Sequence, residues 1–498
     1  MIIKRIKANS LWLCSSLMFV QSLAAEEKSK EREMPNIVFL IADDVTRDDF
    51  GCYGHPLVKT PNIDALATDG IRFDNMFLTA SSSSPSRCSI ITGRYPHNHG
   101  ACELSSPIGE EQVSFVELLK AAGYYTTQAG KWHLGNSTRK PAGPLLRAFD
   151  RTGGSKSDGG GPGGENRWVE FLKERPVDKP FFMWFAAHDA HRTWDDDRSL
   201  ERYHPDDVAV PCFFVDDEAT REDFASYYYE ISRFDYFVGK VVEELKHQGV
   251  YDNTLIIVMA DNGRPFVRSK ARLLVDGVRT PFVVHCPKTI PHKVGSVCTS
   301  LVSSVDLAPT VMDIVGVESS KTFQGRSFKT LFKRPDKKFR RYAFAEHNWH
   351  DFEAYERMIC TDRYLLIMNA RPELTAEGPT DVVVSPSEEA LRTTYIAGTL
   401  DSLQMDIFVT PRAKYELYDY VNDPIQEYEL SSQEPKILKK MCALLEQWQQ
   451  ETGDDIPEKL TPDWYIRGTN VRTSAYKERR EMPGTAHKAV SNNCSGPF

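Results

Sequence analysis

Two apolar runs of the sequence are each followed by side chains that could bind a metal ion. Asp43 and Asp44 follow the first run, and Asp261 and Asn262 follow the second. Adjacent carboxylates repel each other unless a cation or a proton lies between them. Three carboxylates and one amide oxygen suit a hard divalent cation, either Ca²⁺ or Mg²⁺. Taken singly, each pair is more typical of a helix cap or a turn, so the metal site depends on both pairs meeting.

Basic side chains follow two further apolar runs. Lys131 and His133 come after one of them, and His188, His191 and Arg192 come after the other. Imidazoles can move protons, and cationic groups can neutralise an anion such as sulfate or phosphate. The His-x-x-His spacing could also hold a metal, but the HExxH helix typical of zinc enzymes is absent. The candidate cations for an anionic substrate are Arg87, Lys131 and Lys270.

The segment 83–94 is the most specific part of the sequence. It reads Ser-Ser-Pro-Ser-Arg-Cys-Ser-Ile-Ile-Thr-Gly-Arg. Pro85 and the apolar residues after it predict a helix that begins near Pro85, with Ser83 just before its positive end. A helix start of this kind favours an anion. By composition alone, the segment would be a serine-rich turn before an ordinary helix.

The elements that position these residues alternate between strands and helices as far as about residue 320. Short, continuously apolar or β-prone runs predict strands buried on both faces. These runs are Asn36–Ile41, Tyr124–Gln128, Pro180–Phe185, Thr254–Met259 and Pro281–Val284. Apolar residues spaced by three and four predict helices at 116–122 and 224–245. The alternation predicts an α/β fold with a mostly parallel sheet flanked by helices, in which ligands bind at the carboxyl ends of the strands.

From about residue 335 the pattern predicts a smaller α+β subdomain with an antiparallel sheet. Its expected elements are strands at 341–346, 357–360, 364–368 and 415–419, an irregular stretch up to about 412, and a helix around 437–448. The predicted organisation is a signal peptide (1–25), a catalytic domain (26–335), a C-terminal subdomain (336–470) and a polar tail (471–498) that drapes over the surface or frays.

Composition limits the partners and the compartment of the chain. Of 498 residues, 61 are Lys or Arg and 70 are Asp or Glu, which gives a net charge of −9 and argues against a nucleic-acid partner. Three basic residues precede the apolar run Leu11–Leu23, which ends at Ala24 and Ala25. This pattern predicts a signal peptide cleaved near Ala24/Ala25 and an exported protein, periplasmic or secreted. The run is shorter than the roughly 20 residues that a membrane span needs.

The order Ser83-x-Pro-Ser-Arg87, followed by Thr-Gly-Arg94, resembles the signature of the type I, formylglycine-dependent sulfatases. The resemblance extends from about residue 35 to about 455. It includes the segments 42–44, 60–64, 130–133, 260–263, 279–281 and 415–419. In that family the first signature residue is a cysteine or serine that is converted to formylglycine (3-oxoalanine). Ser83 stands there, which implies a serine-type radical maturase as a partner; Cys88 is not the site, because Pro-Ser-Arg does not follow it.

The resemblance also implies an alkaline-phosphatase-like fold and a role for each candidate residue. The implied calcium ligands are Asp43, Asp44, the modified Ser83, Asp261 and Asn262. The implied catalytic groups are Arg87, which supports the hydrated aldehyde, Lys131 and Lys270, which contact sulfate, and His133 and His191, which move protons. The Lys270 match lies in the most variable segment.

The chemistry explains why the family needs a modified residue. A hydrated aldehyde has two hydroxyl groups, and one of them accepts the sulfuryl group while His191 protonates the leaving group. His133 can then remove the proton of the other hydroxyl, so that C–O cleavage expels sulfate and restores the aldehyde.

Within the family, the segments 181–192 and 261–266 and the segment from Tyr415 look most like the sulfamidase (heparan N-sulfatase) branch. Two residues depart from it, because Ser83 replaces the cysteine of the animal enzymes and Ala190 stands where proline is usual. The implied substrate is a sulfated saccharide, a glycosaminoglycan or other polysaccharide fragment, with N-sulfo and O-sulfo groups both open. Candidate contacts to the sugar are His188, Arg192, His347 and His350.

Two alternatives remain at this point. One is a phosphate or phosphonate ester hydrolase on the same scaffold, which a single divalent site and the intact signature order disfavour. The other is a non-catalytic carbohydrate-binding relative, which an unmodified Ser83 in the native host would support.

Overall fold

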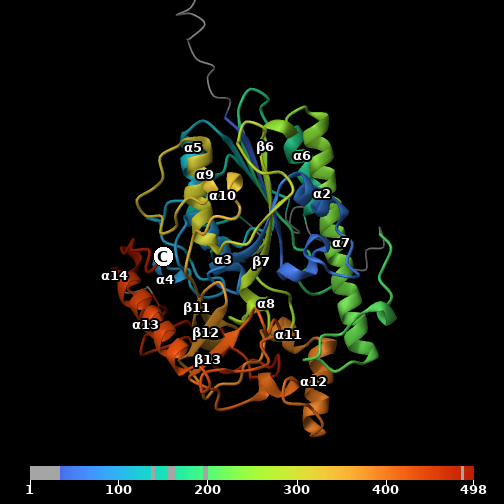
Figure 1. Cartoon of the computed structure of the whole chain (residues 1–498), viewed down its shortest axis with the longest axis vertical. Coiled ribbons are helices and arrows are strands. Elements are labelled where there is room, and N and C mark those ends of the chain that lie inside the picture. Colours follow the sequence, from blue (N-terminus) through green and yellow to red (C-terminus); the bar gives the residue numbers. More distant parts are fainter. Residues whose placement is uncertain (1–33, 136–140, 155–163, 195–199, 484–486) are drawn as a thin grey trace, which may run out of the picture. The chain divides into compact units, whose positions relative to one another are not determined.

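A mostly parallel sheet forms the centre of the fold (Figure 1). The structure, a computed structural model, describes residues 34–135, 141–154, 164–194, 200–483 and 487–498. In these residues the sheet has nine strands: β1 (Asn36–Ala42), β2 (Ile71–Phe77), β3 (Tyr125–Gly130), β4 (Arg151–Gly153), β5 (Phe181–Ala186), β6 (Thr254–Ala260), β7 (Arg279–His285), β8 (Ser296–Cys298) and β9 (Val302–Ser303). Their order is β4-β3-β5-β1-β6-β7-β2-β8, with β9 beside β2, and only the pairs of β7 with β6 and β2 are antiparallel.

Helices cover both faces of this sheet, which explains the continuously apolar strands. On one face lie α2 (Pro61–Asp69), α6 (Trp168–Lys173) and α7 (Glu218–His247), and on the other lie α3 (Ser83–Thr92), α5 (Phe115–Ala121) and α9 (Leu307–Val315) (Figure 1). Val38 and Leu40 of β1 belong to the same apolar cluster as Phe234 of α7. The ring of Phe39, which points the other way, lies 5.7 Å from that of Phe115 on α5. The predicted fold class is confirmed.

A second, antiparallel sheet follows in the chain. Its strands, in spatial order, are β10 (Ala343–His350), β11 (Phe352–Cys360), β12 (Tyr364–Asn369) and β13 (Tyr415–Asp419). Helix α13 (Pro435–Thr452) packs on one face, where Trp448 stacks on Phe344 with 5.1 Å between ring centroids. On the opposite face, Ala345 shares an apolar cluster with Phe77 of β2. The expected antiparallel sheet is therefore present, whereas the domain boundary near 335 stays a prediction.

The stretch expected to be irregular contains two helices, so that expectation is wrong. They are α11 (Thr380–Val383) and α12 (Pro386–Ile396). Helix α12 is capped by Ser385, whose side chain accepts a hydrogen bond from the Glu388 N–H, and it has Pro386 at its first position. The other short helices are α4 (Pro96–His99), α8 (Val275–Val278), α10 (Thr330–Lys333) and α14 (His487–Val490).

The described part of the polar tail is held against the main fold rather than frayed. Arg94, which follows α3, donates hydrogen bonds to the carbonyl oxygens of Val490 and Asn492 at 2.7 and 3.0 Å. The predicted signal peptide and its cleavage site near Ala24/Ala25 lie outside the described residues. Among the described helices, none combines the length and the apolar character that crossing a membrane would require.

Candidate active site

The carboxylates predicted to bind a metal meet where β1 and β6 end. The two strands are neighbours with Ala42 opposite Ala260, so Asp43 and Asp261 leave the sheet side by side. Carboxylate oxygens of these residues and of Asp44 lie within 4.8 Å of one another, and all three residues are buried. The Asp44 N–H donates a hydrogen bond to Asp261 Oδ1 at 3.2 Å. Buried carboxylates this close to one another need positive charge to offset their repulsion.

Ser83 reaches this cluster from the first residue of α3. The helix begins at Ser83, after Ser82 as N-cap, and therefore earlier than the predicted start near Pro85. The Ser83 hydroxyl donates to Asn262 Oδ1 at 3.0 Å and lies 3.3 Å from Asp43 Oδ1. It thus joins residues that follow two different strands.

Arg87 lies one helical turn after Ser83 and so on the same face of α3. Its Nε donates to Asp261 Oδ2 at 2.7 Å, and its Nη2 lies 3.5 Å from Asp43 Oδ1. The side chain is fully buried, and Nη1 has no hydrogen-bond partner among the described residues. A buried donor without a partner is one that a ligand can satisfy.

Lys131 follows β3 and faces Asp43. Its Nζ lies 2.7 and 2.5 Å from the two oxygens of the Asp43 carboxylate and 3.1 Å from Ser83 Oγ. Burial acts to raise the pKa of Asp43, but the charges of Lys131, His191 and Arg87 hold this pKa below its ordinary value. Asp43 is therefore ionised and available as a ligand.

Lys270 lies between two carboxylates. Its Nζ is 2.7 Å from Asp44 Oδ2 and 2.6 Å from Asp381 Oδ2. Burial raises the pKa of Asp44, and Lys270 offsets only part of this effect. For Lys270 itself, burial acts to lower the pKa, but Asp381 and Asp44 raise it above its ordinary value. Three cations, Arg87, Lys131 and Lys270, thus accompany the three carboxylates.

The two histidines predicted to move protons line the pocket above Ser83. Burial, followed by the charge of Lys131, puts the pKa of His133 well below its ordinary value, so the imidazole is neutral. Its Nε2 lies 3.0 Å from Ser105 Oγ. His191, which follows β5, contacts the carbonyl oxygen of Arg192 through Nδ1, and its Nε2 lies 3.9 Å from Asp44. The Nε2 atom is therefore the one that faces the cluster.

One pocket of about 340 Å³ unites most of the predicted residues. The predicted residues that line it are Ser83, Lys131, His133, His188, His191, Arg192, Lys270 and His350. The other residues that line it are Leu104, Ser105, Asp351, Thr380 and Asp381, which the sequence did not single out. Asp351 and Asp381 carry no sequence signature, and α11, which carries Asp381, has only four residues.

Arg192 and His350 have protein partners in the structure. The Arg192 guanidinium is paired with the Asp223 carboxylate at 2.6 and 2.8 Å and donates through Nε to the Pro265 carbonyl oxygen. Its donors are thus engaged in holding the loop after β5. His350 contacts Ser82 Oγ through Nδ1 at 2.9 Å, beside the helix that carries Ser83.

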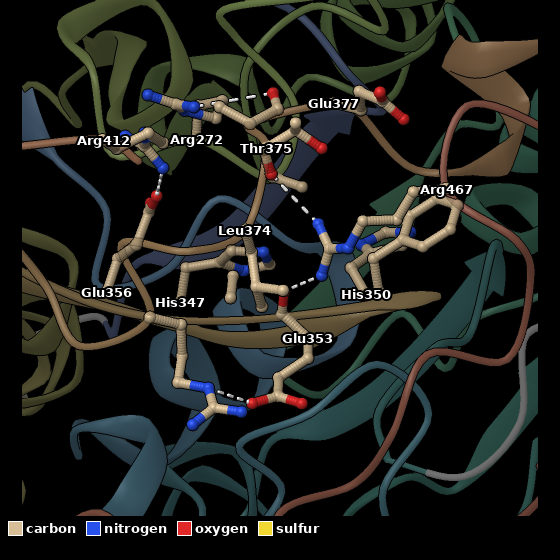
Figure 2. A pocket seen from close by; sticks show the side chains of 15 residues that line it. Arg272, His347, His350, Glu353, Glu356, Leu374, Thr375, Glu377, Arg412 and Arg467 are labelled. Atoms are coloured by element: carbon tan, nitrogen blue, oxygen red, sulfur yellow. Dashed lines mark hydrogen bonds and ion pairs between the residues drawn. The ribbon is translucent and has the colours of Figure 1, made fainter. Parts of the chain in front are cut away.

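His347 does not line this pocket, which is the candidate catalytic pocket. It lies in a separate, much smaller cavity of about 20 Å³ among Arg272, Glu356 and Arg412 (Figure 2). Burial lowers the pKa of His347 to about 4. The strand β10 changes register between His347 and Trp349, and of the two β10 histidines only His350 lines both cavities.

A neighbouring pocket of about 410 Å³ continues the catalytic one. It shares Arg192, Thr380 and Asp381 with it, and Trp194 and Tyr465 add aromatic surface. Such surfaces suit the apolar faces of sugar rings.

Comparison with known protein families identifies two matches. A family model described as sulfatase matches residues 35–317, and a second, described as N-sulphoglucosamine sulphohydrolase, C-terminal, matches residues 269–376. Human N-sulphoglucosamine sulphohydrolase is 29% identical over 499 aligned positions, which cover 90% of this chain and 97% of the human protein. An ulvan-active sulfatase of Formosa agariphila is 29% identical over 87% of this chain and 84% of that protein.

Solved structures share the fold at lower sequence identity. A 2-O glycosaminoglycan sulfatase has a TM-score of 0.64 and 19% identity, and the match covers 91% of this chain and 100% of that one. A protein in complex with its substrate, D-glucosamine-2-N,6-O-disulfate, has a TM-score of 0.61 and 20% identity over 84% of this chain and 98% of that one.

Proposed function

Because this chain belongs to the sulfatase family, we propose that it is an exported, calcium-dependent enzyme that hydrolyses N-sulfo groups of glucosamine residues in a sulfated saccharide. One observation carries the proposal: the Ser83 hydroxyl lies within hydrogen-bond reach of Asn262, Asp43 and Lys131 at the floor of the pocket. The signature residue, the metal ligands and a sulfate-binding cation therefore adjoin one another.

The donor set fits calcium. Asp43, Asp44, Asp261 and Asn262 would hold the ion, since they offer hard oxygens at one buried position. Four carboxylates, those of Asp43, Asp44, Asp261 and Asp381, face the three cations Arg87, Lys131 and Lys270. A bound dication would therefore make the net charge of these groups positive, which favours an anionic substrate. When bound, calcium would stabilise the negative charge of the sulfate oxygens.

The side chain of Ser83 fits the formylglycine site of the family. Once matured by a serine-type radical enzyme, it would supply a hydroxyl nucleophile on the hydrated aldehyde. Lys131 and Arg87 hold and stabilise that position, because Lys131 Nζ lies 3.1 Å from Ser83 Oγ and Arg87 Nη1 is a buried donor with no hydrogen-bond partner among the described residues.

The two pocket histidines then divide the proton transfers. His191 donates a proton from Nε2 to the leaving nitrogen as the S–N bond breaks. His133, which is neutral, would accept the proton of the hydroxyl that does not carry the sulfuryl group, so that the C–O bond to the sulfate breaks and the aldehyde is restored. Lys131 and Lys270 compensate the charge of the sulfate oxygens during the transfer.

The choice of an N-sulfo group over an O-sulfo group rests on the relatives. The human relative named N-sulphoglucosamine sulphohydrolase aligns over 97% of its length, and the C-terminal family model carries the same name. The adjoining aromatic pocket has room for neighbouring sugars, which is consistent with a glycosaminoglycan or other polysaccharide fragment as substrate.

A phosphate or phosphonate ester hydrolase with a second metal is less consistent with the site. Asp44, His191 and Asp381 form a second group with metal-like spacing, but the Lys270 ammonium already lies between the two carboxylates. The site is therefore better suited to one metal ion than to two.

Export and domain organisation complete the proposal. Residues 1–25 would be removed as a signal peptide, which places the enzyme in the periplasm or outside the cell. Residues 26–335 would form the catalytic domain and residues 336–470 the C-terminal subdomain, followed by the tail 471–498.

The proposal is tested by measuring sulfate release from N-sulfoglucosamine and glucosamine 6-sulfate, and phosphate release from nitrophenyl phosphate. The protein is matured by co-expression with a serine-type maturase, and each reaction is repeated after chelation and after calcium is restored. We expect calcium-dependent sulfate release that is fastest on the N-sulfo sugar. Faster phosphate release, or sulfate release unchanged by chelation, would contradict the proposal.

A further inference from the structure

Asp381 lies beside the proposed proton donor at the wall of the catalytic pocket. Its Oδ2 is 3.7 Å from His191 Nε2 and 2.6 Å from Lys270 Nζ. The side chain is 23% exposed, whereas that of Asp44, on the other side of Lys270, is fully buried. Of these two carboxylates, Asp381 is the one that a substrate can touch.

The position of Asp381 is held by the turn between β10 and β11. Asp351 occupies this turn with φ 64° and accepts hydrogen bonds through Oδ2 from the Thr380 N–H at 3.1 Å and the Thr380 hydroxyl at 2.8 Å. These bonds fix the start of α11 to the smaller sheet. The sheet thereby sets the position of the next residue, Asp381, at the pocket wall.

The Asp381 carboxylate is an acceptor only. Burial acts to raise its pKa, but Lys270, followed by His191 and His350, brings the pKa below its ordinary value. An ionised carboxylate can accept hydrogen bonds but cannot donate one.

The atom that links the sulfuryl group to the sugar distinguishes the two substrate classes. In an N-sulfo group this atom is a nitrogen that carries a hydrogen, and in a sulfate ester it is an oxygen without one. Because His191 Nε2 and Asp381 Oδ2 are 3.7 Å apart, a single atom can lie about 3 Å from both. A nitrogen there donates its hydrogen to Asp381, whereas an ester oxygen would place lone pairs against the carboxylate.

We propose that Asp381 is a specificity residue that accepts a hydrogen bond from the N–H of the N-sulfo group and so selects it over an O-sulfo group. This inference rests on the proposed function. As the S–N bond breaks, the sulfuryl group leaves with the nucleophile, and the nitrogen keeps its hydrogen and gains a second one from His191. The product is an amine, which becomes an ammonium ion on taking a proton from water and stays next to the carboxylate.

The test compares two substrates that differ only in the linking atom, N-sulfoglucosamine and glucose 2-sulfate, with nitrophenyl sulfate as a second ester. Loss of a hydrogen bond to a charged acceptor corresponds to a fall in kcat/KM of about 10- to 100-fold. We expect Asp381→Asn to lower kcat/KM for the N-sulfo sugar by about that factor, with a much smaller change for the two esters. The ratio of the two values does not depend on how much of each preparation is folded and matured.

A matched control is Asp406→Asn, which also converts an acid to an amide in an ion pair, here with Arg268, outside the catalytic pocket. The ratio of kcat/KM for N-sulfoglucosamine to kcat/KM for glucose 2-sulfate should be the same in this variant as in the unchanged protein. Suppose that the unchanged protein hydrolyses the N-sulfo sugar but Asp381→Asn lowers kcat/KM for all three substrates by the same factor. Asp381 then only positions Lys270, and the inference is wrong while the proposed function stands. If the unchanged protein releases sulfate from esters alone or from none of them, the proposed function and the inference both fail.

Discussion

Replacing Asp261 by asparagine tests whether this residue binds the metal ion or only stabilises the fold. Asp261 is a predicted calcium ligand and also the partner of Arg87, with which it forms a pair whose side chains are both fully buried. Asparagine keeps the shape but removes the charge, so Arg87 loses its closest counter-charge. Removing one partner of a buried ion pair costs about 3 to 5 kcal/mol of unfolding free energy.

The effect on calcium should be larger than this structural cost suggests. Loss of an outer-shell partner typically lowers metal affinity about 10- to 100-fold, so loss of a charged ligand should exceed this range. We expect Asp261→Asn protein to be purified without stoichiometric calcium and with no detectable turnover. Metal content is measured by mass spectrometry, turnover by sulfate release, and stability by thermal unfolding with and without added calcium.

Asp306 provides the control. It forms an ion pair with Arg340 in which both side chains are also fully buried, but it does not line the pocket. Asp306→Asn should lose comparable stability while it keeps calcium and turnover per folded molecule. The reasoning is refuted if Asp261→Asn retains bound calcium and normal turnover, or if both variants lose calcium to the same extent.

Two further predictions concern proton transfer and stability. His191→Gln should lower kcat on a sulfated sugar by about 10² to 10⁴, but much less on nitrophenyl sulfate, whose leaving group departs without a proton; an equal loss on both would show that His191 is not the acid. Glu103 is buried and its pKa is raised from 4.5 to about 7, so the folded protein retains a proton that the unfolded chain loses as the pH rises between these values. Stability from this group is therefore present at low pH and falls by up to about 3 kcal/mol as the pH rises through 7. The free energy of unfolding is measured with urea at about pH 5 and about pH 8, and it should fall less between these values in Glu103→Gln than in the unchanged protein. An equal fall in the two proteins would contradict this prediction.

The carboxylate cluster was predictable because its position depends on few physical rules. Strands buried on both faces are recognisable as apolar runs, and such strands end at a common edge where ligands bind. The pairing of β1 with β6 then brings Asp43 and Asp261 together, as the two acidic pairs suggested. The roles predicted for Ser83 and Arg87 followed from the resemblance of their segment to the sulfatase signature rather than from composition.

The rest of the pocket was not predictable, for reasons that are also physical. Asp381 meets Lys270 across 111 positions of sequence, from a four-residue helix without apolar periodicity. Helix α12 was missed because its N-cap, Ser385, is its clearest signal and few apolar residues follow. His347 and His350 both lie on β10, and the spacing of the two does not indicate which one lines the catalytic pocket.

The central claim is that Ser83, next to the carboxylate cluster, becomes the nucleophile-bearing residue of a sulfatase. It is tested most directly by mass spectrometry of the peptide that contains Ser83, in protein isolated from the native host, alongside sulfate release by the same preparation. The account predicts that this residue has lost two hydrogen atoms and that activity rises in proportion to the converted fraction. An unmodified serine in fully active protein would contradict it.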